Sequence, residues 1–157
     1  MKVSRAILGG IVGALAMSLA MFLMRRAGID VSLEGLLGTL LPGRSWIGGL
    51  ALHLLIGALV GLIYAVVFEY AVQRSGALVG AGLGVAHGLV AGLFMSGIAA
   101  MNPLDLNYTS APGAFLSNLK LGPVVFLALH CLYGLVVGLM YGHPLQKEHL
   151  YHGPHPV

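Results

Sequence analysis

Residues 51–64 read ALHLLIGALVGLIY, and residues 128–141 read ALHCLYGLVVGLMY. Nine of these fourteen positions are identical at an offset of 77. Apolar helices resemble one another through composition, but a single histidine and a terminal tyrosine that match in register indicate a duplicated segment. The histidine, two glycines and the tyrosine stand at i, i+4, i+8 and i+11, so they share one face of a helix.

Both stretches lie inside longer apolar runs. The chain has four such runs, at about residues 6–24, 46–68, 77–101 and 121–141, and none contains Asp, Glu, Lys or Arg. Each is close to the roughly 20 residues that a helix needs to cross about 30 Å of hydrocarbon. Charged residues are 8% of the chain and mean hydropathy is +0.93, against about 25% charged residues in a typical soluble domain. The composition excludes a soluble globular domain and intrinsic disorder, and predicts four membrane-spanning helices.

The first and third runs also resemble each other, at an offset of 78. Ala6, Gly10, Ala14 and Ser18 align with Gly84, Gly88, Gly92 and Ser96, and small residues four apart allow helices to approach closely in lipid. The predicted fold class is therefore all-α: an integral membrane four-helix bundle over residues 1–142, built from a duplicated two-helix hairpin.

Two further segments complete this prediction. Leu36, Leu37, Leu40 and Leu41 make an apolar stripe between the first two runs, which predicts a short interfacial amphipathic helix. Residues 143–157 form a polar, histidine-rich tail. An even number of spans puts both termini on one side. Each side of the membrane would carry four Lys and Arg residues, so the positive-inside rule does not decide the orientation. The longer loops lie on the side opposite the termini, which favours cytoplasmic termini.

The second and fourth runs carry a wider motif, which consists of Trp46, His53, Gly57, Leu129, His130, Tyr133, Gly134, Gly138, Tyr141 and Gly142. In these residues the chain resembles a domain-of-unknown-function family of small four-helix bacterial integral membrane proteins. The resemblance covers about residues 6–142. It implies the four-helix architecture and a bacterial inner membrane, and it brings no assigned chemistry.

Three intramembrane histidines, His53, His87 and His130, are the first candidates for a site, because an imidazole in hydrocarbon is costly and needs a partner inside the bundle. One hypothesis is structural: each ring bonds a carbonyl or a serine across a close helix contact, and the glycines serve packing. A second is a haem b site with His53 and His130 as axial ligands. In that site Gly57 and Gly134 would make room for the macrocycle, and Arg44 and Lys120 would meet its propionates.

A third hypothesis is a channel or transporter for protons or a small solute, centred on His87. Its pore or packing residues would be Ser18, Ser96, Gly84, Gly88, Gly92, Tyr64 and Tyr141. A metal site formed by His53, His87 and His130 is a fourth hypothesis.

Motifs of the common hydrolases, metalloproteases and nucleotide-binding enzymes are missing from the sequence. We therefore expect a small non-enzymatic membrane protein that acts as an accessory subunit or a homo-oligomer. Its expected partners are the lipid bilayer and other membrane subunits or copies of itself. No basic run is long enough for nucleic acid.

Overall fold

The computed structural model describes residues 1–29, 31–101 and 122–145. Regular structure within these ranges is entirely helical. The elements are α1 (Val3–Arg26), α2 (Leu33–Thr39), α3 (Trp46–Val66), a π-helical turn η1 (Val67–Ala71), α4 (Ala77–Met101) and α6 (Gly122–Tyr141). Each of the four apolar runs is thus helical. Lys120 and most of the histidine-rich tail lie outside the described residues.

Three helical runs are long and apolar enough to cross a membrane: Val3–Arg26, Trp46–Ala71 and Val124–Tyr141. In α4 the described side chains make a shorter apolar run, Ala77–Leu93. The protein is therefore all-helical with three candidate membrane spans in its described part, and a fourth span is a proposal.

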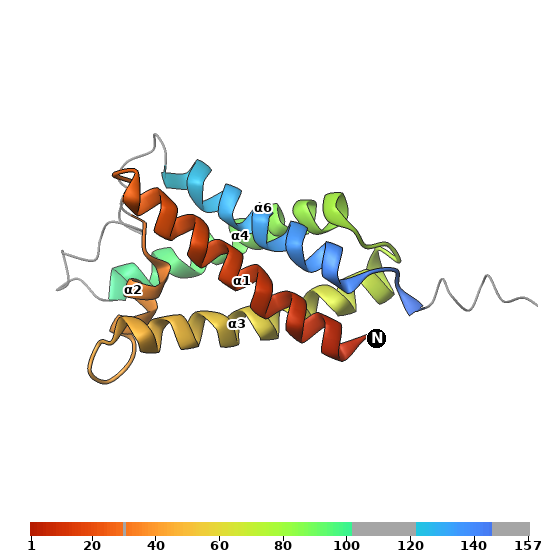
Figure 1. Ribbon diagram of the computed structural model, residues 1–157, viewed down its shortest axis with the longest axis horizontal. Helices are drawn as coiled ribbons and strands as arrows, with labels where there is room; N and C mark the ends of the chain where they lie inside the picture. Colours follow the sequence, from red (N-terminus) through yellow and green to blue (C-terminus); the bar gives the residue numbers. More distant parts are fainter. Residues whose placement is uncertain (30, 102–121, 146–157) are drawn as a thin grey trace, which may run out of the picture.

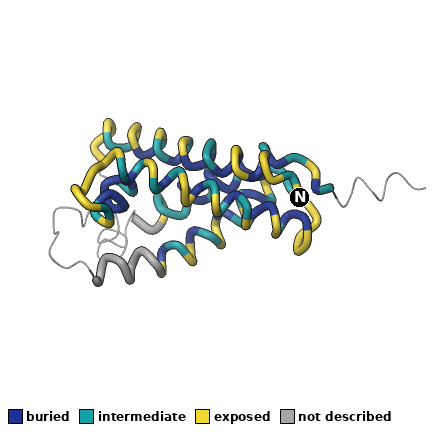
Figure 2. Tube along the Cα trace, turned by 90° about the horizontal axis from the view of Figure 1, so that it is seen from below, coloured by how far each residue is buried: buried dark blue, intermediate teal, exposed yellow. Residues whose placement is uncertain are grey.

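The helices form an elongated assembly in which α1 lies against both α3 and α6, and α6 also lies against α4 (Figure 1). Among the described residues, α3 and α4 make no extensive contact with each other. Buried residues run along the middle of the assembly, and exposed ones follow its outer faces (Figure 2). Much of that outer surface is apolar, as lipid contact requires.

Local signals in the sequence explain where several helices begin and end. Gly28 adopts a φ of +85° after α1, and the amide of Ile29 returns to the Met24 carbonyl at 2.9 Å, which is a Schellman ending. Ser32 caps α2 by accepting the amide of Gly35 at 3.0 Å. Ser45 caps α3 in the same way.

Two helix pairs pack backbone to backbone through glycine. A Cβ added to Gly10 or Gly57 would overlap the facing helix in the α1–α3 pair, and one added to Gly80 or Gly134 would do so in the α4–α6 pair. Such contacts are typical of helix association in lipid. The contacts pair Gly134 with Gly80, whereas the alignment at an offset of 78 matches Gly10 with Gly88. Gly57 and Gly134 correspond in the repeat, so the glycines that meet them, Gly10 and Gly80, correspond as well. The glycine contacts thus relate α1 to α4 at an offset of 70.

The short helix α2 differs from the leucine-stripe expectation. Leu36 and Leu37 are buried, but Leu40 is 47% exposed. The helix packs on the start of α3, where Gly49 lies against the backbone of Glu34. The Glu34 side chain is buried here, whereas an amphipathic surface helix would have turned it to water.

Both ends of the described chain lie at one end of the assembly. The Lys2 amide donates to the Tyr141 hydroxyl at 3.1 Å, and the Lys2 ammonium donates to the His143 carbonyl at 2.8 Å. The start of α1 therefore meets the end of α6 (Figure 1). The side of the membrane on which this end lies stays a prediction.

Candidate functional site

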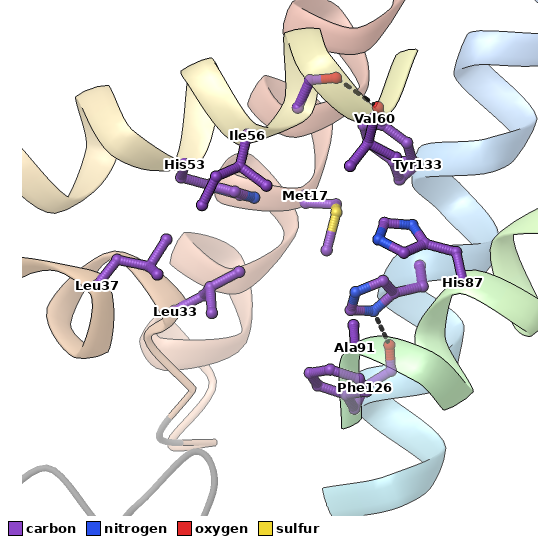
Figure 3. A pocket seen from close by; sticks show the side chains of 12 residues that line it. Met17, Leu33, Leu37, His53, Ile56, Val60, His87, Ala91, Phe126 and Tyr133 are labelled. Atoms are coloured by element: carbon purple, nitrogen blue, oxygen red, sulfur yellow. Dashed lines mark hydrogen bonds between the residues drawn. The ribbon is translucent and has the colours of Figure 1, made fainter. Parts of the chain in front are cut away.

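A cavity lies among the five α-helices of the described residues (Figure 3). Water-sized molecules can occupy about 80 Å³ of it. Its lining is apolar apart from three histidines and a tyrosine, and consists of Met17, Leu33, Leu37, His53, Ile56, Gly57, Val60, His87, Ala91, Phe126, His130 and Tyr133. The structure thus gathers His53, His87 and His130 around one cavity.

His53 enters the cavity from α3 and is only 4% exposed. Its Nδ1 lies 3.2 Å from the Ser18 hydroxyl on α1. This is the bond across a close helix contact that the structural hypothesis expects. Ser18, a pore candidate in the sequence, instead holds the His53 ring.

His130 comes from α6 and bonds within its own helix. Its Nδ1 lies 2.8 Å from the Phe126 carbonyl, and its ring stacks at a tilt on the Phe126 ring, with centroids 4.2 Å apart. A carbonyl oxygen only accepts, so Nδ1 carries the proton. In the neutral ring, Nε2 is consequently a free acceptor.

His87, from α4, has a different environment. Its ring lies edge-to-face with His130 at 4.8 Å and with Tyr64 at 6.0 Å. The His87 Nδ1 and the Tyr64 hydroxyl are both buried, and neither has a hydrogen-bond partner among the described residues. An unpaired buried polar group costs about 1–3 kcal/mol, so each of these two atoms requires an explanation, and of the two residues only His87 lines the cavity.

Tyr133 closes one wall of the cavity. Its hydroxyl donates to the Gly57 carbonyl at 2.6 Å, from α6 to α3, and its ring lies over Gly13 of α1. The sequence named Tyr133 only as part of a motif. The corresponding position in the other segment is Ile56, which lines the same cavity. The alignment of the two segments could therefore have indicated that Tyr133 faces the same way as the cavity residues.

The two glycines that the haem hypothesis assigned to the macrocycle face other helices. The space beside Gly57 is filled by α1, and the space beside Gly134 is filled by α4. The cavity is about 80 Å³, well below the roughly 300 Å³ at which pockets for drug-sized ligands begin. Arg44 is exposed and does not line the cavity.

The metal hypothesis also finds no support in this geometry. In residues 1–29, 31–101 and 122–145, no three His, Cys, Asp or Glu side chains are arranged to hold a metal ion. Met17 lies between His53 and His87 in the cavity (Figure 3).

The other transport candidates are dispersed. Gly84 packs on the His130 backbone and Gly88 on the His130 ring. Gly92 is buried in α4, and the side chain of Ser96 lies outside the described residues. Tyr141 lies at the far end of α6. Tyr64 lies edge-to-face with the His87 ring, but neither it nor any other described member of this set lines the cavity.

Two buried carboxylates were not expected from the sequence. Glu69 is 1% exposed, and it accepts from the Tyr141 hydroxyl at 2.5 Å and from the Leu145 amide at 3.0 Å. It follows an apolar run directly, and the π-turn carries it inside the helical assembly. Glu34 is fully buried, with one oxygen 3.7 Å from the Arg25 guanidinium and the other without a hydrogen bond.

Comparisons with protein-family models, curated proteins and solved structures gave no match. The resemblance to the four-helix family therefore stays a prediction.

Proposed function

We propose that this chain is an integral membrane protein of four spanning helices that binds a small hydrogen-bonding molecule in the three-histidine cavity. The observation that carries the proposal is the His87 Nδ1, a buried polar atom that has no hydrogen-bond partner among the described residues and belongs to a residue lining the cavity. Hydrocarbon offers such groups no partner. A bound molecule that accepts or donates hydrogen bonds removes this cost.

The size of the cavity limits the ligand. A volume of about 80 Å³ is roughly half of an engineered cavity of about 150 Å³ that accepts benzene. The cavity thus suits a ligand of a few non-hydrogen atoms, or the head group of a larger molecule. An apolar lining with a few convergent polar groups is usual for such sites.

The proposed architecture is a duplicated hairpin, with α1–α3 as one unit and α4–α6 as the other. In support, Gly57 meets Gly10 as Gly134 meets Gly80. His53 and His130, which correspond in the repeat, reach the same cavity. The glycine contacts relate α1 to α4 at an offset of 70 residues, whereas the sequence alignment relates them at an offset of 78. The difference of eight residues is about two helical turns.

Blocking the cavity tests the binding proposal. Ile56 lines the cavity and is 37% exposed, so Ile56→Trp can fill the cavity without disturbing a helix contact. Leu59→Trp is the matched control, because Leu59 lies on the same helix, is 55% exposed and does not line the cavity.

Acetate, acetamide and ethanol serve as small probes in thermal unfolding of the detergent-solubilised protein. A probe that binds the folded state at 100 times its Kd stabilises it by about 2.7 kcal/mol. We expect at least one probe to raise the Tm of the wild type and of Leu59→Trp, but not that of Ile56→Trp. If no probe shifts the wild type, or if Ile56→Trp responds equally, the histidines are structural and the proposal fails.

Proton transfer is the second candidate function, favoured by two buried carboxylates. Glu34 lies on α2, which packs on the start of α3, and Glu69 lies on η1, which follows the end of α3. Against it, Phe68 and Val137, both 0% exposed, fill the core toward Glu69. Proton flux into dye-loaded vesicles that disappears in His87→Phe would establish this function. Flux that survives the substitution would exclude His87 as a relay.

A further inference from the structure

We take the exposed part of the cavity wall, on α3 and α4, as the opening of the cavity. Ile56 and Val60 line it from α3 and Ala91 lines it from α4, and all three are partly or largely exposed. The two helices make no extensive contact in the described part of the chain. In a bilayer such an opening faces acyl chains, so a ligand reaches the histidines from the lipid.

The polar groups of the lining are basic or neutral. The twelve lining residues include three imidazoles and no Asp, Glu, Lys or Arg. Tyr133 already donates its proton to the Gly57 carbonyl. The His130 Nε2 is a free acceptor, since Nδ1 holds the ring proton against the Phe126 carbonyl. The cavity therefore combines a proton acceptor with an apolar entrance.

We infer that the ligand is a single-chain carboxylic acid, with its carboxyl group beside His87 and His130 and its acyl chain leaving between α3 and α4. This inference rests on the proposed function and specifies its ligand class. A carboxyl group is small enough for about 80 Å³, while the chain stays in lipid. The carboxylic O–H gives its proton to the His130 Nε2, which leaves a carboxylate beside an imidazolium.

The remaining contacts suit this ion pair. His87 has an unpaired Nδ1, and in the tautomer that carries hydrogen there it donates to the second carboxylate oxygen. Hydrogen bonds between ions are about twice as strong as neutral ones, and low dielectric strengthens them further. The other charged groups of this region are Glu34 and Arg25, which form an ion pair at 3.7 Å. The Glu34 carboxylate is thus partly neutralised by its own partner.

The test uses the full chain in dodecyl maltoside with palmitic acid labelled with ¹³C at the carboxyl group. Hexadecanol is the neutral probe of equal chain length, and hexadecyltrimethylammonium is the cationic one. We expect the carboxyl ¹³C resonance to shift on binding. Palmitate should bind at least about tenfold more tightly than hexadecanol, as the loss of a charge-assisted hydrogen bond implies.

Variants locate the binding. His130→Phe and His87→Phe keep a ring of similar size and should each weaken palmitate binding at least about tenfold, with circular dichroism as the check on folding. Two independent positions are used because one variant alone could fail to fold. Ile56→Trp should block binding, and Leu59→Trp should not.

The outcomes separate the two proposals. If the small probes bind but palmitate does not, the cavity is a ligand site and the fatty-acid inference is overturned. Equal affinity for hexadecanol, or tighter binding of the ammonium, overturns the carboxyl assignment. If neither the small probes nor palmitate binds, both proposals fall.

Discussion

The glycine contact between α4 and α6 can be tested with two alanines on one helix. A Cβ at position 80 would overlap the Gly134 carbonyl and lie 3.0 Å from the Gly138 Cα. These are backbone atoms, so α4 must move away from α6. Gly82 lies two residues along α4, and a Cβ there meets nothing within 4 Å.

Both substitutions gain the same helix propensity, about 1 kcal/mol for Gly→Ala. The difference between their free energies of unfolding therefore measures the contact of position 80 with α6. Overpacking a tight interface costs about 1–3 kcal/mol. Gly80→Ala should therefore be less stable than Gly82→Ala by about 1–3 kcal/mol, a factor of roughly 5–150 in the unfolding equilibrium constant.

Reversible unfolding by SDS in mixed micelles, followed by circular dichroism, measures this difference. Gly82→Ala should match the wild type or exceed it slightly. If the two variants agree within ~0.5 kcal/mol, the usual spread for neutral surface substitutions, then α4 and α6 do not pack through Gly80, and the proposed hairpin pairing is refuted.

Three further predictions concern other contacts. Tyr133→Phe removes the 2.6 Å bond to α3 and should lower the free energy of unfolding by about 0.5–1.5 kcal/mol; an unchanged value would show that the bond does not form. Arg25→Ala leaves the fully buried Glu34 carboxylate without its ionic partner, whereas Glu34→Gln removes the charge itself. We therefore expect Arg25→Ala to lower the free energy of unfolding by about 1–3 kcal/mol more than Glu34→Gln does. The reverse order would contradict the ion pair. Cysteines at Gln73 and Gly28, in a background without the native cysteine, should react with an impermeant maleimide from opposite sides of the membrane, because α3 separates the two loops; labelling from one side alone would mean that α3 does not span.

The helices could be read from the sequence with few errors. Uncharged apolar runs of about 20 residues become helices in lipid because every backbone group must be bonded within the segment. The first and second runs extend beyond their expected ends, and in the second the turn η1 (Val67–Ala71) carries Glu69 into the helical assembly. A residue just beyond a run has no sequence feature that says whether it faces water or protein.

The histidine positions were informative, but their roles were not. Equal spacing put His53 and His130 on corresponding faces, and both reach one cavity. His87 belongs to no repeated pair, yet its Nδ1 is buried without a hydrogen-bond partner among the described residues. Tyr133 matters because the other segment has Ile56 in its place, an asymmetry that a search for identities passes over.

The sequence by itself determined the helical runs, their apolar character and the residues that share each helical face, because hydropathy and a period of 3.6 residues act within one helix. Only the tertiary structure decided what lies against each face. Gly57 and Gly134 were equally compatible with a cofactor and with a helix, and their space is taken by Gly10 and Gly80. Periodicity in the sequence fixes the direction in which a residue points around its own helix axis. It does not say which helix lies opposite or how far away that helix is, and these two facts decide whether a glycine face is a binding site or a packing contact.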